Sequence, residues 1–428
     1  MMTYRYLIIA LLSAVTASAQ PQELPNWEQC LEKTRLHSPE LAKARSALQE
    51  LEYGVASAGS VFLPQISASA SASRGQRESG SGSTNSPSWV DTESVSAGIS
   101  VSQDLFSGGG NAAKRRRAQA QLAIGQAQYR QTLADVELRL RQAFIEVLYA
   151  QDLVRLTQQI AERRANNVRL IQLRFDGGRE NAGSLARSKA QLSQADYEVR
   201  EATRSLEYAL RNLAAAMGQL DSPKGVAGEL NADQPGERDE LLQLMRQTPD
   251  YAVSVIQVQS AKEGFKVSRS SRFPSMSLSA STGLSGSDDL ETGSWSVGLR
   301  ASVPLFTGNR LSSEMAAAKE NVVQSEMDLL NQANTLTAIL QQRWNSYVDA
   351  VENETVQQEL YEAELLRAEI SSAKYKQGLL SYEDWDIIES NLINQGKTRL
   401  QRRRSSEIEQ ARWKNTLGFS VWYTEQGE

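Results

Sequence analysis

Apolar and polar residues alternate along two stretches of the chain, 95–105 and 295–305. In the second stretch the odd positions carry Trp, Val, Leu, Ala, Val and Leu, and the even positions carry Ser, Gly, Arg, Ser and Pro. A period of two gives a β-strand one apolar face and one polar face. Similar alternation precedes each stretch, separated from it by a polar, Gly/Ser-rich segment. The pattern predicts two β-hairpins, at about 62–106 and 273–306. Taken alone, these hairpins fit a membrane β-barrel or a soluble β-sandwich equally well.

After each hairpin the pattern changes to an apolar heptad repeat. In the first region apolar residues recur every seven positions from Leu133 to Phe175, and in the second from Ala333 to Tyr375, with Glu354 as the one exception. No proline interrupts either region. A sustained seven-residue repeat is typical of long helices that supercoil on their neighbours. We expect four long helices, at about 112–175, 184–217, 312–375 and 383–416.

The two halves of the chain repeat each other. The motif Leu105-Phe106-Ser107-Gly108 recurs as Leu305-Phe306-Thr307-Gly308, and the offset of 200 continues without a gap for more than 100 residues. Upstream of the hairpins the offset becomes 210. A repeat of this length predicts a duplicated domain rather than a solenoid. We expect a first structural repeat over 20–225 and a second over 226–428, each with a short helix, a β-hairpin and two long helices.

The N-terminus has the features of a secretory signal peptide over residues 1–19. Arg5 supplies the positive start, an apolar core of about ten residues follows, and small residues precede a cleavage site between Ala19 and Gln20. Such a core is too short to span a bilayer. Cys30 lies too far from this site to accept a lipid. We therefore expect an exported protein that is not lipidated.

The composition argues against several functional classes. A formal net charge of −5 gives no reason to expect nucleic acid as a partner. His37 is the only histidine and Cys30 the only cysteine, so no His/Cys metal cluster or nucleophile–base pair can be built. The run Gly108-Gly109-Gly110 lacks the Lys-Ser/Thr of a phosphate-binding loop. We expect neither catalysis nor a cofactor, which disfavours a secreted enzyme.

Four amphipathic strands are too few to close a membrane barrel within one chain, so a barrel requires several copies. The smallest closed barrels have about eight strands, and an open sheet edge is prohibited in lipid. Three chains would supply twelve strands, and their long helices could close into a coiled-coil cylinder. The expected fold is therefore a mixed α/β membrane protein, a trimeric twelve-stranded β-barrel continued by a long α-helical barrel. The alternative is a periplasmic coiled-coil adaptor or structural protein without a pore.

Each hairpin ends in the repeated Leu-Phe-(Ser/Thr)-Gly motif, immediately before a long helix. We expect Leu and Phe to lie at the membrane boundary and glycine to free the backbone for the change from strand to helix. The expected hinge residues are Leu105, Phe106, Gly108, Leu305, Phe306 and Gly308.

From about Leu31 to Phe419 the chain resembles the TolC-like outer-membrane factor family, the exit ducts of tripartite efflux pumps and type I secretion systems. The resemblance is carried by both hinge motifs, by two helix starts and by two helix tips, namely Ser38-Pro39-Glu40-Leu41, Thr248-Pro249-Asp250, Arg174-Phe175-Asp176-Gly177-Gly178 and Lys374-Tyr375-Lys376-Gln377-Gly378. It implies a homotrimer in the outer membrane of a Gram-negative bacterium, in contact with lipid and extending into the periplasm. It also implies two partners, a periplasmic adaptor protein and an inner-membrane ABC or proton-driven transporter. The cargo stays open between proteins or adhesins and small molecules, and the absence of a lipid site leans slightly toward proteins or adhesins.

The resemblance places two functions at the helix tips. Residues expected to dock the adaptor are Phe175, Gly177, Gly178, Gln377, Gly378 and Leu379. The expected periplasmic gate or constriction consists of Tyr375, Asp384, Asp386 and Ser184.

Within that gate, Tyr375 matches the family's gate tyrosine and Asp384 matches one aspartate of its charged rings. The second ring aspartate corresponds to Ile387, so Asp386, one residue away, is the candidate substitute. The gate arginine corresponds to Leu380, and Ser184 stands where the family has an aspartate partner. The plainer interpretation is that the acidic cluster at 383–389 complements the dipole of a helix N-terminus.

Overall fold

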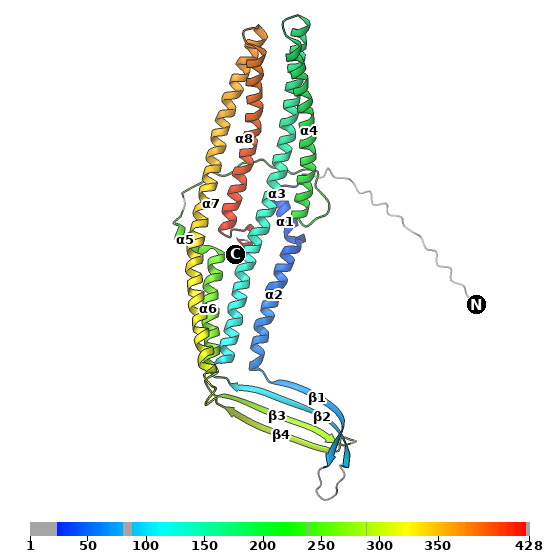
Figure 1. Ribbon diagram of the computed structural model, residues 1–428, viewed down its shortest axis with the longest axis vertical. Helices are drawn as coiled ribbons and strands as arrows, with labels where there is room; N and C mark the ends of the chain where they lie inside the picture. The colour runs from blue at the N-terminus through cyan, green and yellow to red at the C-terminus, as the bar shows by residue number, and fades with distance from the viewer. Residues whose placement is uncertain (1–23, 80–87, 238, 288, 425–428) are drawn as a thin grey trace, which may run out of the picture.

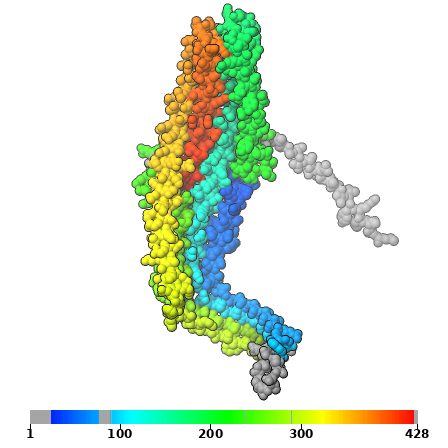
Figure 2. Space-filling view, viewed as in Figure 1, coloured from blue at the N-terminus to red at the C-terminus, as the bar shows by residue number. Residues whose placement is uncertain are grey.

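A computed structural model describes residues 24–79, 88–237, 239–287 and 289–424. The expected signal segment 1–19, with its cleavage site at Ala19 and Gln20, lies outside the described residues. Figure 1 shows an elongated molecule in which long helices stand on a small sheet, and the sheet projects sideways from their ends. The same outline is visible on the molecular surface, where the two helix tips lie at the end opposite the sheet (Figure 2).

Two very long helices, α3 (Gly110–Asp176) and α7 (Arg310–Gln377), run from the sheet to the tips. At about 1.5 Å per residue, the 67 residues of α3 extend roughly 100 Å. Near the sheet they pack against α2 (Pro39–Gly59) and α6 (Pro249–Ser270). Near the tips they form hairpins with α4 (Ala182–Ala216) and α8 (Tyr382–Thr416). These bounds lie within about two residues of those predicted for the four long helices.

The Ser-Pro and Thr-Pro pairs of the sequence begin α2 and α6. Ser38 and Thr248 are the N-caps, and their hydroxyls accept hydrogen bonds from the amides of Leu41 and Tyr251. Proline follows at the first helical position, where its missing N–H is not needed. The two repeats therefore begin with the same local chemistry.

The hydrophobic pattern did not predict three short helices: α1 (Trp27–His37), α5 (Leu241–Gln247) and α9 (Val421–Thr424). A 3₁₀ turn, η1 (Ser60–Phe62), also joins α2 to the sheet. Elements of one to three turns show too few periods to stand out from the background. The clearest local signal is the reciprocal cap of Asn26 and Gln29 at the start of α1.

The sheet is antiparallel, in the order β1-β2-β3-β4. Its strands are β1 (Gln65–Ser79), β2 (Ser88–Phe106), β3 (Ser275–Gly286) and β4 (Thr292–Ser302). The two predicted hairpins are thus joined by pairing between β2 and β3. Within the described chain, the outer edges of β1 and β4 have no strand beside them.

The pairing register places the alternating residues on two distinct faces. One apolar row crosses all four strands through Ile66, Val101, Ala280 and Val297. The opposite face carries cross-strand serine pairs, whose hydroxyls lie 2.8 to 2.9 Å apart, namely Ser67–Ser100, Ser71–Ser96, Ser73–Ser94 and Ser281–Ser296. The sheet therefore has one apolar and one hydroxyl-rich face.

The two hinges differ in how far their strands extend. β2 continues to Phe106, but β4 stops at Ser302, so Leu305 and Phe306 lie beyond the ladder and are almost fully exposed. Pro304 has no amide hydrogen to donate to a neighbouring strand, which accounts for the earlier end of β4. Gly108 and Gly308 both have positive φ, as the expected change from strand to helix requires.

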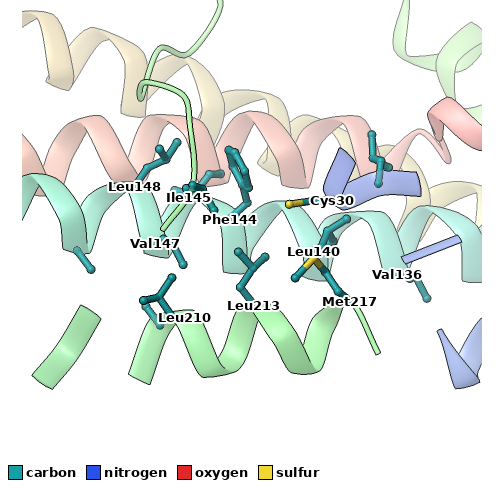
Figure 3. Packing of buried hydrophobic residues seen from close by; sticks show 14 of the residues in the cluster. Cys30, Val136, Leu140, Phe144, Ile145, Val147, Leu148, Leu210, Leu213 and Met217 are labelled. Atoms are coloured by element: carbon teal, nitrogen blue, oxygen red, sulfur yellow. The ribbon is translucent and has the colours of Figure 1, made fainter. Parts of the chain in front are cut away.

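The largest core lies between α3 and α4, with α1 beside them. Figure 3 shows Leu213 of α4 and Met217, the residue that caps α4, pointing toward α3, and Cys30 of α1 close to Leu140. The Cys30 side chain is fully buried, and burial raises its thiol pKa to about 11. A second core packs α7 against α5 and α8, and it contains Leu244, Met245, Leu336, Leu340, Tyr347, Val351, Trp413 and Leu417. Within the described residues, no helix combines the length and apolar content that crossing a membrane requires.

The two hinge glycines should respond differently to substitution by alanine. A Cβ at Gly108 would lie 2.6 Å from the Phe273 Cβ and 2.8 Å from the Ser270 carbonyl oxygen, whereas one at Gly308 would have nothing within 4 Å. We expect Gly308→Ala to cost only the left-handed strain, about 1–2 kcal/mol, and Gly108→Ala to cost clearly more. Thermal unfolding of the two variants in detergent tests this. Equal shifts in Tm would contradict the packing at Gly108.

Candidate functional site

The candidate site lies where the tips of the two helical hairpins meet. The α3–α4 turn covers 177–181, the α7–α8 turn covers 378–381, and α3 packs against α8. Gly178 and Gly378 have φ values of 68° and 80°, a left-handed conformation that ends a helix at little cost only for glycine. Gly177, at φ −82°, has no such requirement.

Tyr375 is held on every side within this site. Its side chain is fully buried, and its ring stacks on Trp385 with centroids 4.4 Å apart. The Arg174 guanidinium lies 4.5 Å from the ring centroid and donates a hydrogen bond of 2.8 Å to the Tyr375 carbonyl oxygen. The Tyr375 hydroxyl donates to Glu180 at 2.8 Å. Burial, and then the hydrogen bond to Glu180, raise the pKa of this hydroxyl. Tyr375 therefore fastens the second tip to the first.

An apolar cluster surrounds this contact and joins four helices, α3, α4, α7 and α8, and both tips. Its buried members are Ile171, Leu185, Tyr375, Tyr382 and Trp385. Burial also raises the pKa of Tyr382, to about 12. The Tyr382 hydroxyl and the Trp385 indole nitrogen are buried without a hydrogen-bond partner among the described residues.

Asp386 lies beneath this cluster in a set of polar contacts between the hairpins. It is 4% exposed and forms ion pairs with Arg164 of α3, at 3.3 Å, and with Arg187 of α4, at 3.0 Å. Gln191 donates to both of its carboxylate oxygens, at 2.9 and 3.0 Å. The structure therefore does not place Asp386 as a second ring carboxylate at the gate. Its carboxylate points into the protomer and binds the other hairpin.

Glu389 makes an equivalent contact one turn further from the tip. It is 1% exposed and receives two hydrogen bonds from Arg163 of α3, at 2.6 and 2.8 Å. This parallel geometry is the strongest form of the arginine–carboxylate pair. We define the polar latch as the six residues of these two contacts: Arg163, Arg164, Arg187, Gln191, Asp386 and Glu389.

Asp384 is exposed at the start of α8. Its amide donates to the Ser381 hydroxyl at 3.1 Å, and that hydroxyl donates to the Asp384 carboxylate at 2.7 Å. Glu383 lies beside it in the same first turn. Helix capping and dipole complementation therefore account for these two residues within one chain.

Ser184 stands where the family has an aspartate partner, and no hydrogen bond joins it to Tyr375 among the described residues. It is buried in the first turn of α4, and its amide donates to the capping oxygen of Asn181 at 2.9 Å. The acidic partner of Tyr375 is Glu180, which the sequence analysis missed. Glu180 lies in the turn itself, and the turn conformation decides which acidic residue of "DGGRENAGS" reaches the second tip.

The residues expected to dock an adaptor line the outer surface of the tips. Leu379 is 70% exposed, Phe175 is partly exposed, and Gly177, Gly178, Gln377 and Gly378 are exposed. Leu173, 71% exposed, adds a further apolar side chain that the sequence analysis did not select. The tips thus combine a tightly packed interior with an uncovered apolar surface.

Comparison with known proteins identifies relatives along most of the chain. The chain is 25% identical over 309 residues to the pyoverdine export outer membrane protein OpmQ of Pseudomonas aeruginosa, covering 68% of this chain. That alignment spans 63% of OpmQ, less than two thirds of its length. The outer membrane protein TolC of Escherichia coli K12 is 22% identical over 420 residues, covering 92% of this chain and 82% of TolC.

The fold also matches solved structures. The outer membrane protein VceC of Vibrio cholerae superimposes with a TM-score of 0.75 at 18% identity, covering 92% of this chain and 96% of VceC. The duplicated helical hairpins and the four-stranded sheet therefore belong to a known fold. The sequence profile described as "Outer membrane efflux protein" matches residues 30–219 and 241–418, and the chain belongs to that family.

Proposed function

We propose that this protein is an outer-membrane exit duct, in which three copies close a twelve-stranded barrel and continue it as a helical barrel through the periplasm. The duct conducts substrates that an inner-membrane transporter delivers through an adaptor protein. Family membership supports the location in the outer membrane. Two long hairpins interleaved with two strand pairs also favour a duct over an adaptor with one hairpin.

The observation that carries the proposal is the uncovered apolar face of the sheet. Trp295 is 80% exposed, and Val297 and Leu299 beside it are more than half exposed. A soluble protein rarely leaves so continuous an apolar surface uncovered, whereas lipid would cover it. The free edges of β1 and β4 must then be paired, because unpaired backbone groups are prohibitively costly in hydrocarbon. Pairing β4 of one copy with β1 of the next satisfies both requirements.

The long helices supply matching contacts between copies. Val323, Met327 and Leu330 of α7 are exposed and follow one another at spacings of four and three residues. This spacing places them on one helix face. A neighbouring copy packed on this face would bury the stripe and extend the barrel as a cylinder of helices.

The helix tips carry two proposed functions. Their exposed apolar residues, including Leu173 and Leu379, form the surface for an adaptor. Tyr375 and the polar latch hold the second hairpin against the first and keep the periplasmic mouth closed. Three copies of the exposed Asp384 would surround that mouth with negative charge. The partner transporter, of the ABC or proton-driven class, supplies the energy.

The trimer is the first expected outcome. Because the sheet can satisfy its edges only with other copies, mass measurement of detergent-extracted protein should give three chains. A stable monomer in buffer without detergent would contradict the closed barrel.

Two residues of the proposed gate should have separate effects. Asp384 should set the charge selectivity, and Tyr375 should hold the mouth closed. Asp384→Asn should weaken cation preference in planar bilayers, because it removes charge from a narrow, low-dielectric mouth. Tyr375→Ala should instead raise resting conductance and leave selectivity unchanged. Asp328→Asn, an exposed carboxylate on the sheet-side third of α7, is the control. If neither gate variant differs from this control, the constriction lies elsewhere.

The polar latch should stabilise the contact between hairpins. Asp386→Asn leaves Arg164 and Arg187 without their carboxylate, and removing one partner of a buried pair costs about 3–5 kcal/mol. We expect faster amide hydrogen exchange in α3, α4 and α8 near the latch. Glu314→Gln, which breaks the exposed pair with Arg310, should cost about 0–1 kcal/mol and change exchange only locally. Unchanged exchange in Asp386→Asn would show that the apolar cluster alone holds the tips.

A further inference from the structure

The hydroxyl-rich face of the sheet has a highly restricted composition. Along 65–75, 92–104, 275–285 and 292–302, the register places alternate residues on this face. Every one of these positions is Ser, Thr or Gly, apart from Gln65, Asp104 and Arg300. Such side chains are short and uncharged. Any charge on this face within these four ranges therefore comes from Asp104 and Arg300.

The two charged residues share one row of the sheet. Asp104 of β2 pairs with Ser277 of β3, and Ser277 pairs with Arg300 of β4. Both residues lie close to the ends of their strands where the chain passes into α3 and α7. The row therefore marks the junction between sheet and helices.

Asp104 and Arg300 are held differently. The Asp104 carboxylate accepts a hydrogen bond of 3.3 Å from the Asn111 side chain, which ties it to the first turn of α3. Arg300 is exposed, and no carboxylate of the described residues forms an ion pair with it. Two strand spacings, roughly 10 Å, separate the two backbones, because Ser277 lies between them. The guanidinium is therefore the one long, free, charged side chain on this face within the four ranges.

We propose that Arg300 is the charge-selecting residue of the duct's strand-lined section, and that it attracts anionic groups of the cargo at the junction with the helices. The inference rests on the proposed function, since the hydroxyl-rich face encloses a lumen only when three copies close the barrel. Three guanidinium groups would then project into the lumen, and three Asp104 carboxylates, each tethered to α3 through Asn111, would lie in the same row of the wall. Low-dielectric walls focus the field of such charges. The free guanidinium can reach an anionic group of the cargo, and the tethered Asp104 carboxylate partly opposes the attraction.

Block by a multivalent anion in planar bilayers tests this assignment. Citrate is added on the side of the strand loops, and wild-type protein is compared with Arg300→Gln and Arg300→Lys. We expect Arg300→Gln to weaken citrate block by about threefold or more and to shift the reversal potential toward cation preference, because three positive charges leave the lumen. Arg300→Lys keeps the charge and should retain the block. Asp104→Asn should strengthen it.

Arg74→Gln is the matched control, because Arg74 lies on the opposite, apolar face, at the far end of β1. It should leave citrate block at the wild-type value. If citrate blocks Arg300→Gln channels as strongly as wild-type channels, the assignment of Arg300 is overturned, whereas the proposed function is not. A wild-type protein that forms no trimeric channel would overturn the proposed function, and this inference with it.

Discussion

The outer edges of β1 and β4 set the constraint on which the rest of the structure depends. Their backbone N–H and C=O groups have no partner within the described chain, and hydrocarbon offers none. In the proposed duct, the neighbouring copies must therefore pair these edges before the apolar face can enter lipid. The internal duplication fits this demand, because each repeat delivers one hairpin, and two hairpins join through β2 and β3 into a unit that three copies can close.

The long helices are held together by two kinds of contact with different consequences. Around Leu140 and Leu213, within the first hairpin, the contact is apolar and fully buried, which stabilises strongly but has little directional preference. Between the two hairpins, below the apolar cluster of the tips, the contact is the polar latch, where Asp386 and Glu389 are removed from water. Desolvation offsets much of the attraction within a buried ion pair, so its net contribution is smaller than its short distances suggest. Such a contact fixes one geometry and can still be exchanged for hydration, which suits the opening proposed for this end of the duct.

Sequence patterns predicted the long elements well, because their periods repeat many times. The helices from Gly110 and Arg310 and the four strands each present a face that must be buried or covered. Shorter elements such as α1 and α9 contain too few repeats to be detected. At the tips, the sequence singled out Tyr375 as a candidate but not its partner, because Glu180 is brought to it by a turn. Asp386 turned inward for a similar reason, since one residue along a helix rotates a side chain by about 100°.

The burial of Cys30 has a practical consequence for following the proposed opening of the helix tips. It is the only sulfhydryl in the chain, it is fully enclosed between α1 and α3, and burial raises its pKa to about 11. At neutral pH it is almost entirely in the unreactive thiol form and out of reach of maleimides. A single cysteine introduced at an exposed position such as Leu379 can therefore carry a fluorophore or spin label without first removing the native residue. Distances between labelled tips would then report on the proposed trimer and on the opening of its mouth.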